Sequence, residues 1–383
     1  MSLFNVYPLF DITPVKGKDV FVYDTHNTQY LDLYGGHAVI SIGHTHPTYT
    51  KAITNQVNAL GFYSNSIQNP LQVKLAEQIT TISNCQNYQL FLCNSGAEAN
   101  ENALKLASFH TNKKKVIAFK NSFHGRTSAA VAATDNSKIV APINAQQEVI
   151  FLDFEDLVGV EKALQGNDVC AIIIETIQGV GGLDEASTLF YQGLEKLCKE
   201  YNTLLIVDEI QSGFGRTGDF FAFQKHGITP DIISMAKGMG NGFPIGGILI
   251  HPKIEASFGL LGTTFGGNHL ACAASLAVID VLQQEGLMNN VKKVSEYFVE
   301  KLKEIPEVIS IKGRGLMLGI EFPYPIATLR KSLLFNQHIF TGNAKNPNLL
   351  RLLPSLTLQK EHVDIFINAL QKELKLSPNE TLH

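Results

Sequence analysis

The sequence predicts an α/β fold built on a parallel sheet, followed by a second lobe of mixed α+β structure. The clearest observation is a strand–helix–strand unit, in which an apolar run at 170–175 precedes a helical stripe at 190–201 and a returning apolar run at 203–207. The length of 383 residues exceeds the size at which one hydrophobic core usually stops growing, so two lobes are expected. A polar glycine loop before an alanine-rich helix at 269–284 marks a shift in composition, and we place the lobe boundary there.

Composition and charge favour a cytoplasmic enzyme. Hydrophobic residues make up 45% of the chain and charged residues 17%, as in soluble globular proteins. The formal net charge of −4 offers no basic field for nucleic acid or an anionic membrane. The five scattered cysteines form no CxxC pair, so buried free thiols in a reducing compartment are expected. We expect neither a signal peptide nor a membrane span, because the sequence shows neither pattern.

The N-terminal part begins with a predicted hairpin at 18–34 and continues with helical patterns at about 47–60 and 70–83. His44 and His46 lie two residues apart, without a cysteine or carboxylate nearby to complete a ligand set. We therefore interpret them as turn and packing histidines and predict no metal site.

A strand, a small polar turn and a helix start follow one another at 88–106. The apolar strand stops at Asn94, and helical spacing begins after Ser95, Gly96 and Ala97. A helix N-terminus presents free N–H groups and the positive end of its dipole, and small residues let a phosphate approach the backbone closely. The turn is therefore a candidate phosphate site, and an ordinary helix cap by Ser95 is the alternative.

The loop after a short strand at 115–119 carries Phe123 and Arg126. An aromatic face and an arginine within four residues suit a flat, anionic ligand, through stacking and a bidentate carboxylate contact. A surface arginine beside a core phenylalanine is the alternative, and the loop alone leaves both open.

Two acids, Glu175 and Asp208, end the two strands of the strand–helix–strand unit, at the edge where open α/β sheets bind ligands. A further strand at 231–235 leads to Lys237, about one strand-to-strand crossover after Asp208. A buried carboxylate is costly without a partner, so Asp208 is expected to face a cation. Such an acid could keep a heterocyclic nitrogen of a cofactor protonated, and the lysine could form a Schiff base with it.

Glycine-rich runs at 237–242 and 313–315 look like dinucleotide fingerprints, but the helix that such a fingerprint requires does not follow. That context argues against a nicotinamide-dependent dehydrogenase. Arg351 lies within an apolar strand. The C-terminal part is predicted to contain, in order, a helix around 291–302, strands at 310–322 and 349–358, and a helix at 359–375.

Five motifs occur in order along the chain: NSGAEANE, FHGR, DEIQSGFGRTG, AKGMGNGFPIG and GTTFGGN. Together they resemble those of the class III, ornithine-type aminotransferases, from about residue 8 to the C-terminus, and the acetylornithine and succinylornithine aminotransferases in particular. The resemblance implies pyridoxal 5′-phosphate and the fold-type I scaffold, in which a large domain has a mainly parallel central sheet sandwiched by helices. It places an N-terminal segment joining the small lobe at 1–45, the large cofactor-binding domain at 46–268, and the interdomain helix with the small α+β domain at 269–383.

The resemblance implies two catalytic residues, Lys237, which binds the cofactor aldehyde, and Asp208, which pairs with the pyridinium nitrogen. In this family one residue of each subunit contacts the cofactor phosphate bound by the neighbouring subunit, which implies a homodimer with shared active sites. Ser95, Gly96 and Ala97 match the residues that cradle the cofactor phosphate. Phe123 matches the aromatic residue stacked on the ring, and Gln211 matches a residue near the hydroxyl face of the cofactor. Thr264 matches a residue that reaches the phosphate of the neighbouring subunit.

Three residues match substrate contacts in the family. Arg126, with Thr263 beside it, matches the site of the substrate α-carboxylate, and Arg351 matches a second carboxylate-binding arginine in the small domain. Many relatives have a glutamate at the position of Val180, which pairs with this second arginine while the ω-amino substrate is bound. Two interpretations stay open here. Either the loop has changed and other residues compensate for the missing glutamate, or Arg351 accepts an extra carboxylate, as a succinyl group would supply.

The implied reaction transfers the terminal amine of N-acetylornithine, or of N-succinylornithine, to 2-oxoglutarate. The products are the N-acylglutamate 5-semialdehyde and glutamate, a step of arginine biosynthesis. Alternatives within the fold are an ornithine, 4-aminobutyrate or other ω-amino acid aminotransferase. A PLP-dependent aminomutase, which returns the amine to the same substrate, is another alternative and needs no 2-oxoglutarate.

Overall fold

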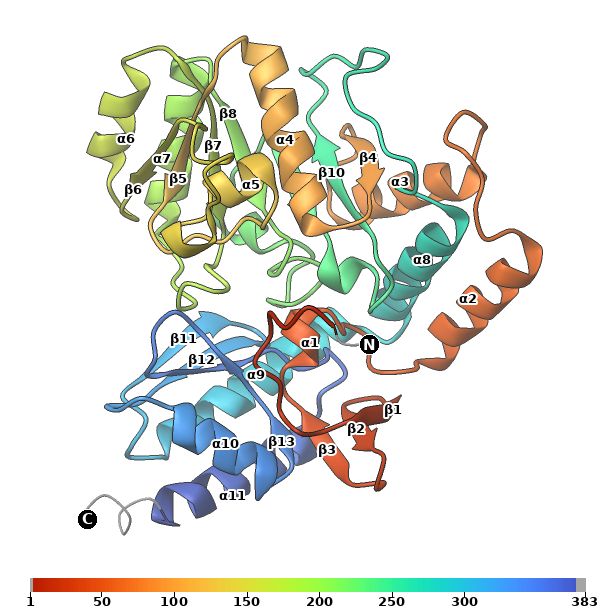
Figure 1. The fold of residues 1–383 in the computed structure, drawn as a ribbon, viewed down its shortest axis with the longest axis vertical. Helices are drawn as coiled ribbons and strands as arrows, with labels where there is room; N and C mark the ends of the chain where they lie inside the picture. The colour runs from red at the N-terminus through yellow and green to blue at the C-terminus, as the bar shows by residue number, and fades with distance from the viewer. Residues whose placement is uncertain (1–2, 377–383) are drawn as a thin grey trace.

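The structure is a computed structural model that describes residues 3–376 and has two lobes (Figure 1). The large lobe is built around a seven-stranded sheet, and the small lobe contains two four-stranded sheets. Residues 1–2 and 377–383, at the outer ends of the predicted N-terminal and C-terminal segments, lie outside the described part. The predicted α/β fold with a second, smaller lobe is confirmed.

The sheet of the large lobe is mainly parallel, as predicted. Its strands are β4 (Gln89–Cys93), β5 (Lys115–Phe119), β6 (Val149–Leu152), β7 (Val169–Glu175), β8 (Leu204–Asp208), β9 (Ile232–Met235) and β10 (Gly246–Ile250). They lie in the order β4-β10-β9-β8-β7-β5-β6, with β10 antiparallel to both of its neighbours. In the parallel register Glu175 pairs with Asp208, and Asp208 pairs with Ser234, so the two acids lie side by side at the carboxyl edge.

Helices cover both faces of this sheet. The core on one face includes residues of α4 (Gly96–Thr111) together with Ile173 of β7, and the core on the other includes residues of α7 (Thr188–Glu200) together with Ile172 and Ile174. Successive side chains of a strand point to opposite faces, so an uninterrupted apolar strand is what a doubly covered sheet requires. Two shorter helices extend the layers beside α4 and α7, respectively: α5 (Ser128–Ala132) and α6 (Leu157–Leu164).

The small lobe combines strands from both ends of the chain. One sheet has the order β1-β2-β3-β13 and comprises β1 (Pro14–Lys18), β2 (Phe21–Asp24), β3 (Gln29–Asp32) and β13 (Ile339–Phe340). The other has the order β11-β12-β15-β14 and comprises β11 (Ser310–Arg314), β12 (Met317–Glu321), β14 (Gly342–Asn343) and β15 (Leu349–Leu352). Its helices are α9 (Leu287–Lys303), α10 (Ala327–Phe335) and α11 (Lys360–Leu376).

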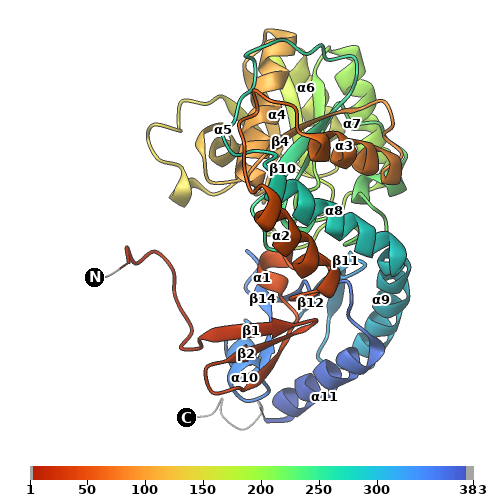
Figure 2. The same cartoon turned by 90° about the vertical axis from the view of Figure 1, so that its right-hand side faces the viewer.

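A buried helix, α8 (His269–Gln284), joins the two lobes. Asn268 caps it, because the Asn268 side chain accepts a hydrogen bond from the N–H of Ala271. Two helices of the large lobe, α2 (Pro47–Ala59) and α3 (Pro70–Ile82), pack against α8, and α9 continues from it into the small lobe (Figure 2).

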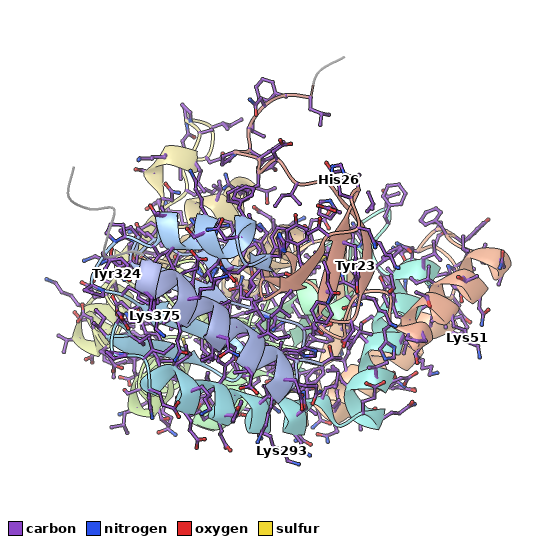
Figure 3. All side chains as sticks on the ribbon, turned by 90° about the horizontal axis from the view of Figure 1, so that it is seen from below. Tyr23, His26, Lys51, Lys293, Tyr324 and Lys375 are labelled. Carbon is purple, nitrogen blue, oxygen red and sulfur yellow. The ribbon has the colours of Figure 1, made fainter. Side chains whose placement is uncertain are left out.

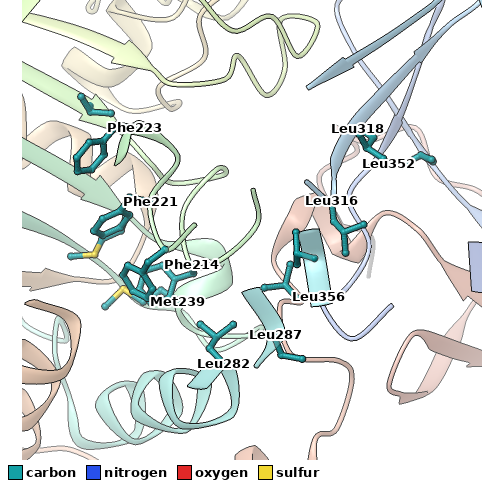
Figure 4. Packing of buried hydrophobic residues seen from close by; sticks show 14 of the residues in the cluster. Phe214, Phe221, Phe223, Met239, Leu282, Leu287, Leu316, Leu318, Leu352 and Leu356 are labelled. Atoms are coloured by element: carbon teal, nitrogen blue, oxygen red, sulfur yellow. The ribbon is translucent and has the colours of Figure 1, made fainter. Parts of the chain in front are cut away.

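The hydrophobic core is continuous between the lobes. Phe214 and Met239 of the large lobe lie near Leu282 of α8, and Leu287 and Leu356 lead on toward the small lobe (Figure 4). All five side chains are buried. The lobes therefore meet through close-packed apolar contacts as well as through the chain that connects them.

Two strand predictions are wrong in extent. The segment 310–322 is a hairpin of two strands, β11 and β12, and the left-handed Gly315, with φ 61°, makes the turn between them. The strand predicted at 349–358 ends at Leu352, because Pro354 has no N–H to donate to a ladder. The sequence also gave no prediction for β6, α6 and α10, which are short.

The N-terminal strands pair with C-terminal β13, which fits an N-terminal segment joining the small lobe, while the boundaries at residues 45 and 268 stay predictions. The five cysteines are buried and free, as expected. Within residues 3–376 no single helix is long and apolar enough to cross a membrane; only the bent pair α8 and α9 passes on length and composition.

Candidate active site

A cavity of about 390 Å³ opens at the carboxyl edge of the large-lobe sheet. The loops that follow β4, β5, β7, β8 and β9 line it, at the edge where open α/β sheets bind ligands. All the predicted cofactor residues except Thr264 lie in its wall, and Arg126 does as well. Residues that are far apart in the sequence are thus brought together as predicted.

The turn before α4 caps the helix and leaves N–H groups at the cavity wall that could bind an anion. The Ser95 side chain accepts a hydrogen bond from the N–H of Glu98 at 3.2 Å. The first N–H groups of a helix have no partner inside it, so those of Gly96 and Ala97 are available to an anion. A side chain at Gly96 would meet Ile210 at 2.9 Å, so a larger residue there would displace the cavity wall. The two interpretations of this turn are therefore compatible.

Asp208 is buried and held by three hydrogen bonds. Its Oδ2 accepts from Nδ1 of His124 and from Nδ2 of Asn100, both at 2.8 Å, and its Oδ1 accepts from the N–H of Ile210 at 3.0 Å. A carboxylate only accepts, so Nδ1 of His124 carries the proton in this contact. The His124 imidazole is thus a hydrogen-bond partner of Asp208, and the cationic partner expected from the sequence stays a prediction.

Lys237 follows β9 and begins a tight turn with a left-handed backbone, at φ 44°. Burial lowers the pKa of its ammonium group, and the negative charges of Asp208 and Glu175 partly oppose that shift. The loop is fixed from the N-terminal segment, because the Ser41 hydroxyl donates to the carbonyl of Gly238 at 2.7 Å. A lysine with a lowered pKa in a rigid loop suits both covalent attachment to an aldehyde and proton transfer.

Glu175 completes a cluster of ionisable groups at the sheet edge. Its carboxylate accepts from the N–H of Phe123 at 2.9 Å and from that of Gly179 at 2.8 Å. Burial, and to a lesser extent the nearby charge of Asp208, raises the pKa of Glu175 to about 7, against an ordinary value of 4.5. The sequence identified Glu175 as an acid at a strand end but assigned it no role.

His124 and Asn100 are site residues that the sequence analysis missed. Asn100 interrupts the buried apolar face of α4 between Ala99 and Ala103, and that interruption was the available signal. His124 lies in the FHGR motif, where only the phenylalanine and the arginine had been given roles. In the described part of the chain Nε2 of His124 has no hydrogen-bond partner.

Arg351 lies in β15 and is only 3% exposed. Its Nη1 donates to the carbonyl of Gly179 at 2.5 Å and to Oε1 of Gln211 at 3.5 Å, while its Nε has no partner among the described residues. Among the same residues, Arg314 is the arginine that forms ion pairs. Arg351 is therefore a buried cation without a carboxylate partner, in contact with Gln211 of the cavity wall.

Thr263 and Thr264 lie outside the cavity of the single chain. Oγ1 of Thr263 accepts from Nδ2 of Asn94, a wall residue, at 3.3 Å, and Thr264 is exposed. The predicted place of Thr263 beside Arg126, and the predicted contact of Thr264 with a neighbouring subunit, stay predictions.

A left-handed turn at Gly35–Ala38, labelled α1 in Figure 1, leads to Val39 in the cavity wall. Its four φ angles are positive, including 69° at His37 and 65° at Ala38. A non-glycine residue in this conformation costs about 1–2 kcal/mol, so the surroundings must hold it in place. Ala38 is buried beside Ile177, and Oδ1 of Asp32 accepts from the N–H of Gly35 at 2.8 Å.

The fold and this cluster are those of a pyridoxal 5′-phosphate enzyme, and three comparisons give its class. The aminotransferase class-III family model matches residues 5–374. An acetylornithine aminotransferase from Aquifex aeolicus is 41% identical, over 97% of this chain and 99% of its own. Among solved structures, the N-acetylornithine aminotransferase from Stenotrophomonas maltophilia K279a has a TM-score of 0.81 and 31% identity and covers 97% of each chain. The ornithine aminotransferase from Toxoplasma gondii ME49 has a TM-score of 0.91 and 26% identity, over 99% of this chain and 93% of its own.

The chain belongs to the class III aminotransferases, and its cofactor is pyridoxal 5′-phosphate. The described residues fit this cofactor. A small-residue turn with free N–H groups suits its phosphate, the fixed Asp208 carboxylate suits its ring nitrogen, and Lys237 suits its aldehyde.

Proposed function

We propose that the enzyme transfers the terminal amino group of an N-acylornithine, N-acetylornithine or N-succinylornithine, to 2-oxoglutarate, as a step of arginine biosynthesis. The observation that carries this proposal is the 41% identity to an acetylornithine aminotransferase along nearly the whole chain. An arginine in the cavity wall and a second, unpaired arginine beside it suit substrates with two carboxylates, such as 2-oxoglutarate.

When bound, the cofactor acts as an electron sink for the substrate carbon that carries the amine. Asp208 keeps the ring nitrogen protonated, and His124 and Asn100 hold the carboxylate in one orientation for that task. Phe123 lies in the wall where a ring can stack on it. The free N–H groups of Gly96 and Ala97 at the start of α4 would hold the phosphate of the cofactor.

Lys237 moves the proton in this scheme. Lys237 would hold the cofactor aldehyde, and its amine, once free, would take the proton from the substrate carbon that carries the amino group. It must be neutral to accept that proton, and its lowered pKa makes the neutral form accessible. Arg126 orients the substrate by its α-carboxylate so that the terminal amine reaches the lysine.

N-succinylornithine is favoured as donor by one observation in particular. Val180 lies in the cavity wall, its carbonyl accepts from the N–H of Lys345 at 2.9 Å, and the adjacent Gly179 contacts Arg351. Within residues 3–376 no carboxylate contacts Arg351 in place of the glutamate, and Glu175 acts on Arg351 only through its charge, without an ion pair. A buried arginine without a partner gains most from a ligand that brings its own carboxylate.

A substrate panel with 2-oxoglutarate as acceptor tests the proposal. We expect kcat/KM for N-succinylornithine to equal or exceed that for N-acetylornithine, and both to exceed the values for ornithine and 4-aminobutyrate. A clear preference for the acetyl substrate would contradict the succinyl part. Turnover of ornithine or 4-aminobutyrate above both would point to another ω-amino acid aminotransferase, and turnover without 2-oxoglutarate would point to an aminomutase.

The enzyme is further proposed to be a cytoplasmic homodimer. Residues 3–9 extend away from the rest of the described chain (Figure 2) and expose large apolar side chains, including Leu3, Phe4 and Leu9 at 94%, 92% and 84%. Exposed apolar side chains that lie together in sequence are typical of a surface that another chain covers. Sedimentation equilibrium of the holoenzyme should give twice the mass of one chain, and Phe4→Asp combined with Leu9→Asp should weaken that association.

A further inference from the structure

The charges of three cations act on His37, an exposed residue of the left-handed turn. Partial burial lowers the pKa of the imidazole, and the charges of Arg351, Lys237 and Arg330 lower it further. Arg351 comes from β15, Arg330 from α10 and Lys237 from the loop after β9, so cations approach from three elements. Tyr34, in the same segment, is the remaining titratable neighbour.

Tyr34 connects His37 to Arg351. Its hydroxyl is hydrogen-bonded to Nδ1 of His37, and the two ring centroids are 4.7 Å apart. The guanidinium carbon of Arg351 lies 5.9 Å from the centroid of the Tyr34 ring. The orphaned Nε of Arg351, nine-tenths or more buried, is thus one residue away from a histidine that remains accessible to solvent.

Arg330 adds positive charge without bringing an acid. Its Nε donates to the carbonyl of Thr341 at 2.9 Å, and its guanidinium lies over the ring of Phe10 at 5.4 Å. Within the described residues neither Arg330 nor Arg351 forms an ion pair, although the charge of Glu175 acts on Arg351 and raises its pKa, against the larger effect of burial.

We propose that His37, with Tyr34, extends the Arg351 site into a pocket for the distal carboxylate of a dicarboxylate ligand, and that His37 takes up a proton when that ligand binds. The proposal rests on the proposed function, because it deepens the choice of substrate. An entering carboxylate neutralises the cations that disfavour imidazolium, which raises the pKa of His37, and the charged ring then adds a donor to the carboxylate. By linkage, dicarboxylates bind more tightly as pH falls.

Titration calorimetry of the cofactor-loaded enzyme with glutarate tests this without turnover. Glutarate has two carboxylates but no keto group, so it cannot accept an amine. Measured at pH 7.5 in phosphate and in Tris, whose ionisation enthalpies differ, the binding enthalpies should reveal uptake of about half a proton or more per site. Pentanoate, with one carboxylate, should show little or none.

His37→Asn is the matched variant, because asparagine tolerates the left-handed backbone and does not titrate near neutral pH. We expect it to keep the visible cofactor band, to lose the proton uptake, and to bind glutarate several-fold more weakly at pH 6.5 but not at pH 8.5. His26→Asn, at an exposed turn histidine (Figure 3), should behave as the wild type. Should His37→Asn not fold, His37→Gly, which also suits positive φ, takes its place.

Proton uptake that persists in His37→Asn, or enthalpies that do not depend on buffer in the wild type, would overturn the proposal. The outcome is separable from that of the proposed function. If glutarate binding is linked to proton uptake but the enzyme does not turn over N-acylornithines, only the proposed function is contradicted. Active turnover of N-acylornithines with unlinked glutarate binding would contradict this inference alone.

Discussion

The cofactor half and the substrate half of the active site differ in how their charged groups are paired. In the cofactor half, Asp208 and Glu175 lie beside Lys237, and each acid has hydrogen-bond partners from the protein. In the substrate half, the charges of Arg351 and Arg330 act on His37, and neither arginine forms an ion pair with a carboxylate of the described residues. The first half is organised before any ligand arrives, whereas the second half depends on the ligand for its negative charge.

Removing the lysine of the cofactor half should have the largest effect. Lys237→Ala deletes the group that attaches to the cofactor and moves the proton, so we expect kcat to fall by about 10²- to 10⁴-fold or more. The visible band that borohydride abolishes in the wild type should also be missing. Lys293→Ala, at a surface lysine of α9 (Figure 3), is the control and should keep both activity and band.

Measurements of the free energy of unfolding test whether the two halves differ in the way described. Arg351→Met removes an unpaired buried cation, so we expect the free energy of unfolding of the cofactor-free chain to rise, by about 1 kcal/mol or more. The same change should lower kcat/KM for 2-oxoglutarate by about 30-fold or more. Asp208→Asn, which leaves the Nδ1–H of His124 without an ionic partner, should instead lower stability by about 1–3 kcal/mol. Urea unfolding measures both variants, and an equal loss of unfolding free energy in Arg351→Met and Asp208→Asn would contradict the difference between the two halves.

The pH dependence of stability should report on Glu175. Its folded pKa of about 7 lies above the ordinary 4.5, so its contribution is complete below pH 4.5 and is lost as the pH rises toward 7. We expect unfolding of the cofactor-free chain to become easier by about 1–3 kcal/mol between pH 5 and pH 8. Glu175→Gln should flatten that profile, and a profile that keeps its slope in the variant would assign the titration to another group.

Supplying the missing acid in the substrate half should have the smallest effect. Val180→Glu places a carboxylate near Arg351, so the ratio of kcat/KM for N-succinylornithine to that for N-acetylornithine should fall, by about tenfold or less. Val180→Gln, of similar size without charge, separates the electrostatic effect from the steric one. An unchanged ratio in Val180→Glu would count against the role given to the unpaired arginine.

The cofactor half could be predicted from the sequence because its residues are fixed by local rules. Glu175 and Asp208 end apolar strands, and parallel strands bring their carboxyl ends to one edge. Ser95 begins a helix, and the start of a helix has a fixed geometry whatever follows it. Such placements need only the register of one sheet.

The substrate half needs contacts between segments that are distant in the chain, and no local rule supplies them. Tyr34, which contacts His37, reaches Arg351 only after the N-terminal segment has folded against the C-terminal sheet. The orphaned Nε and the left-handed φ of His37 have no sequence signal, because a histidine after two glycines is compatible with many turns. The Thr264 assignment depends on a second chain, and both it and the place of Thr263 beside Arg126 stay predictions.

Arg216 connects segments of both lobes through hydrogen bonds to backbone carbonyls, which makes this contact insensitive to salt. Its buried guanidinium donates to carbonyls of three separate segments, those of Leu316, Pro354 and Ile40, and burial lowers its pKa to about 9. Carbonyl acceptors carry no counter-charge that dissolved ions could screen, unlike the carboxylates of surface ion pairs. Ionic strength should therefore weaken anion capture by the substrate half while leaving the lobes in register, so salt inhibition of this enzyme should be competitive and reversible.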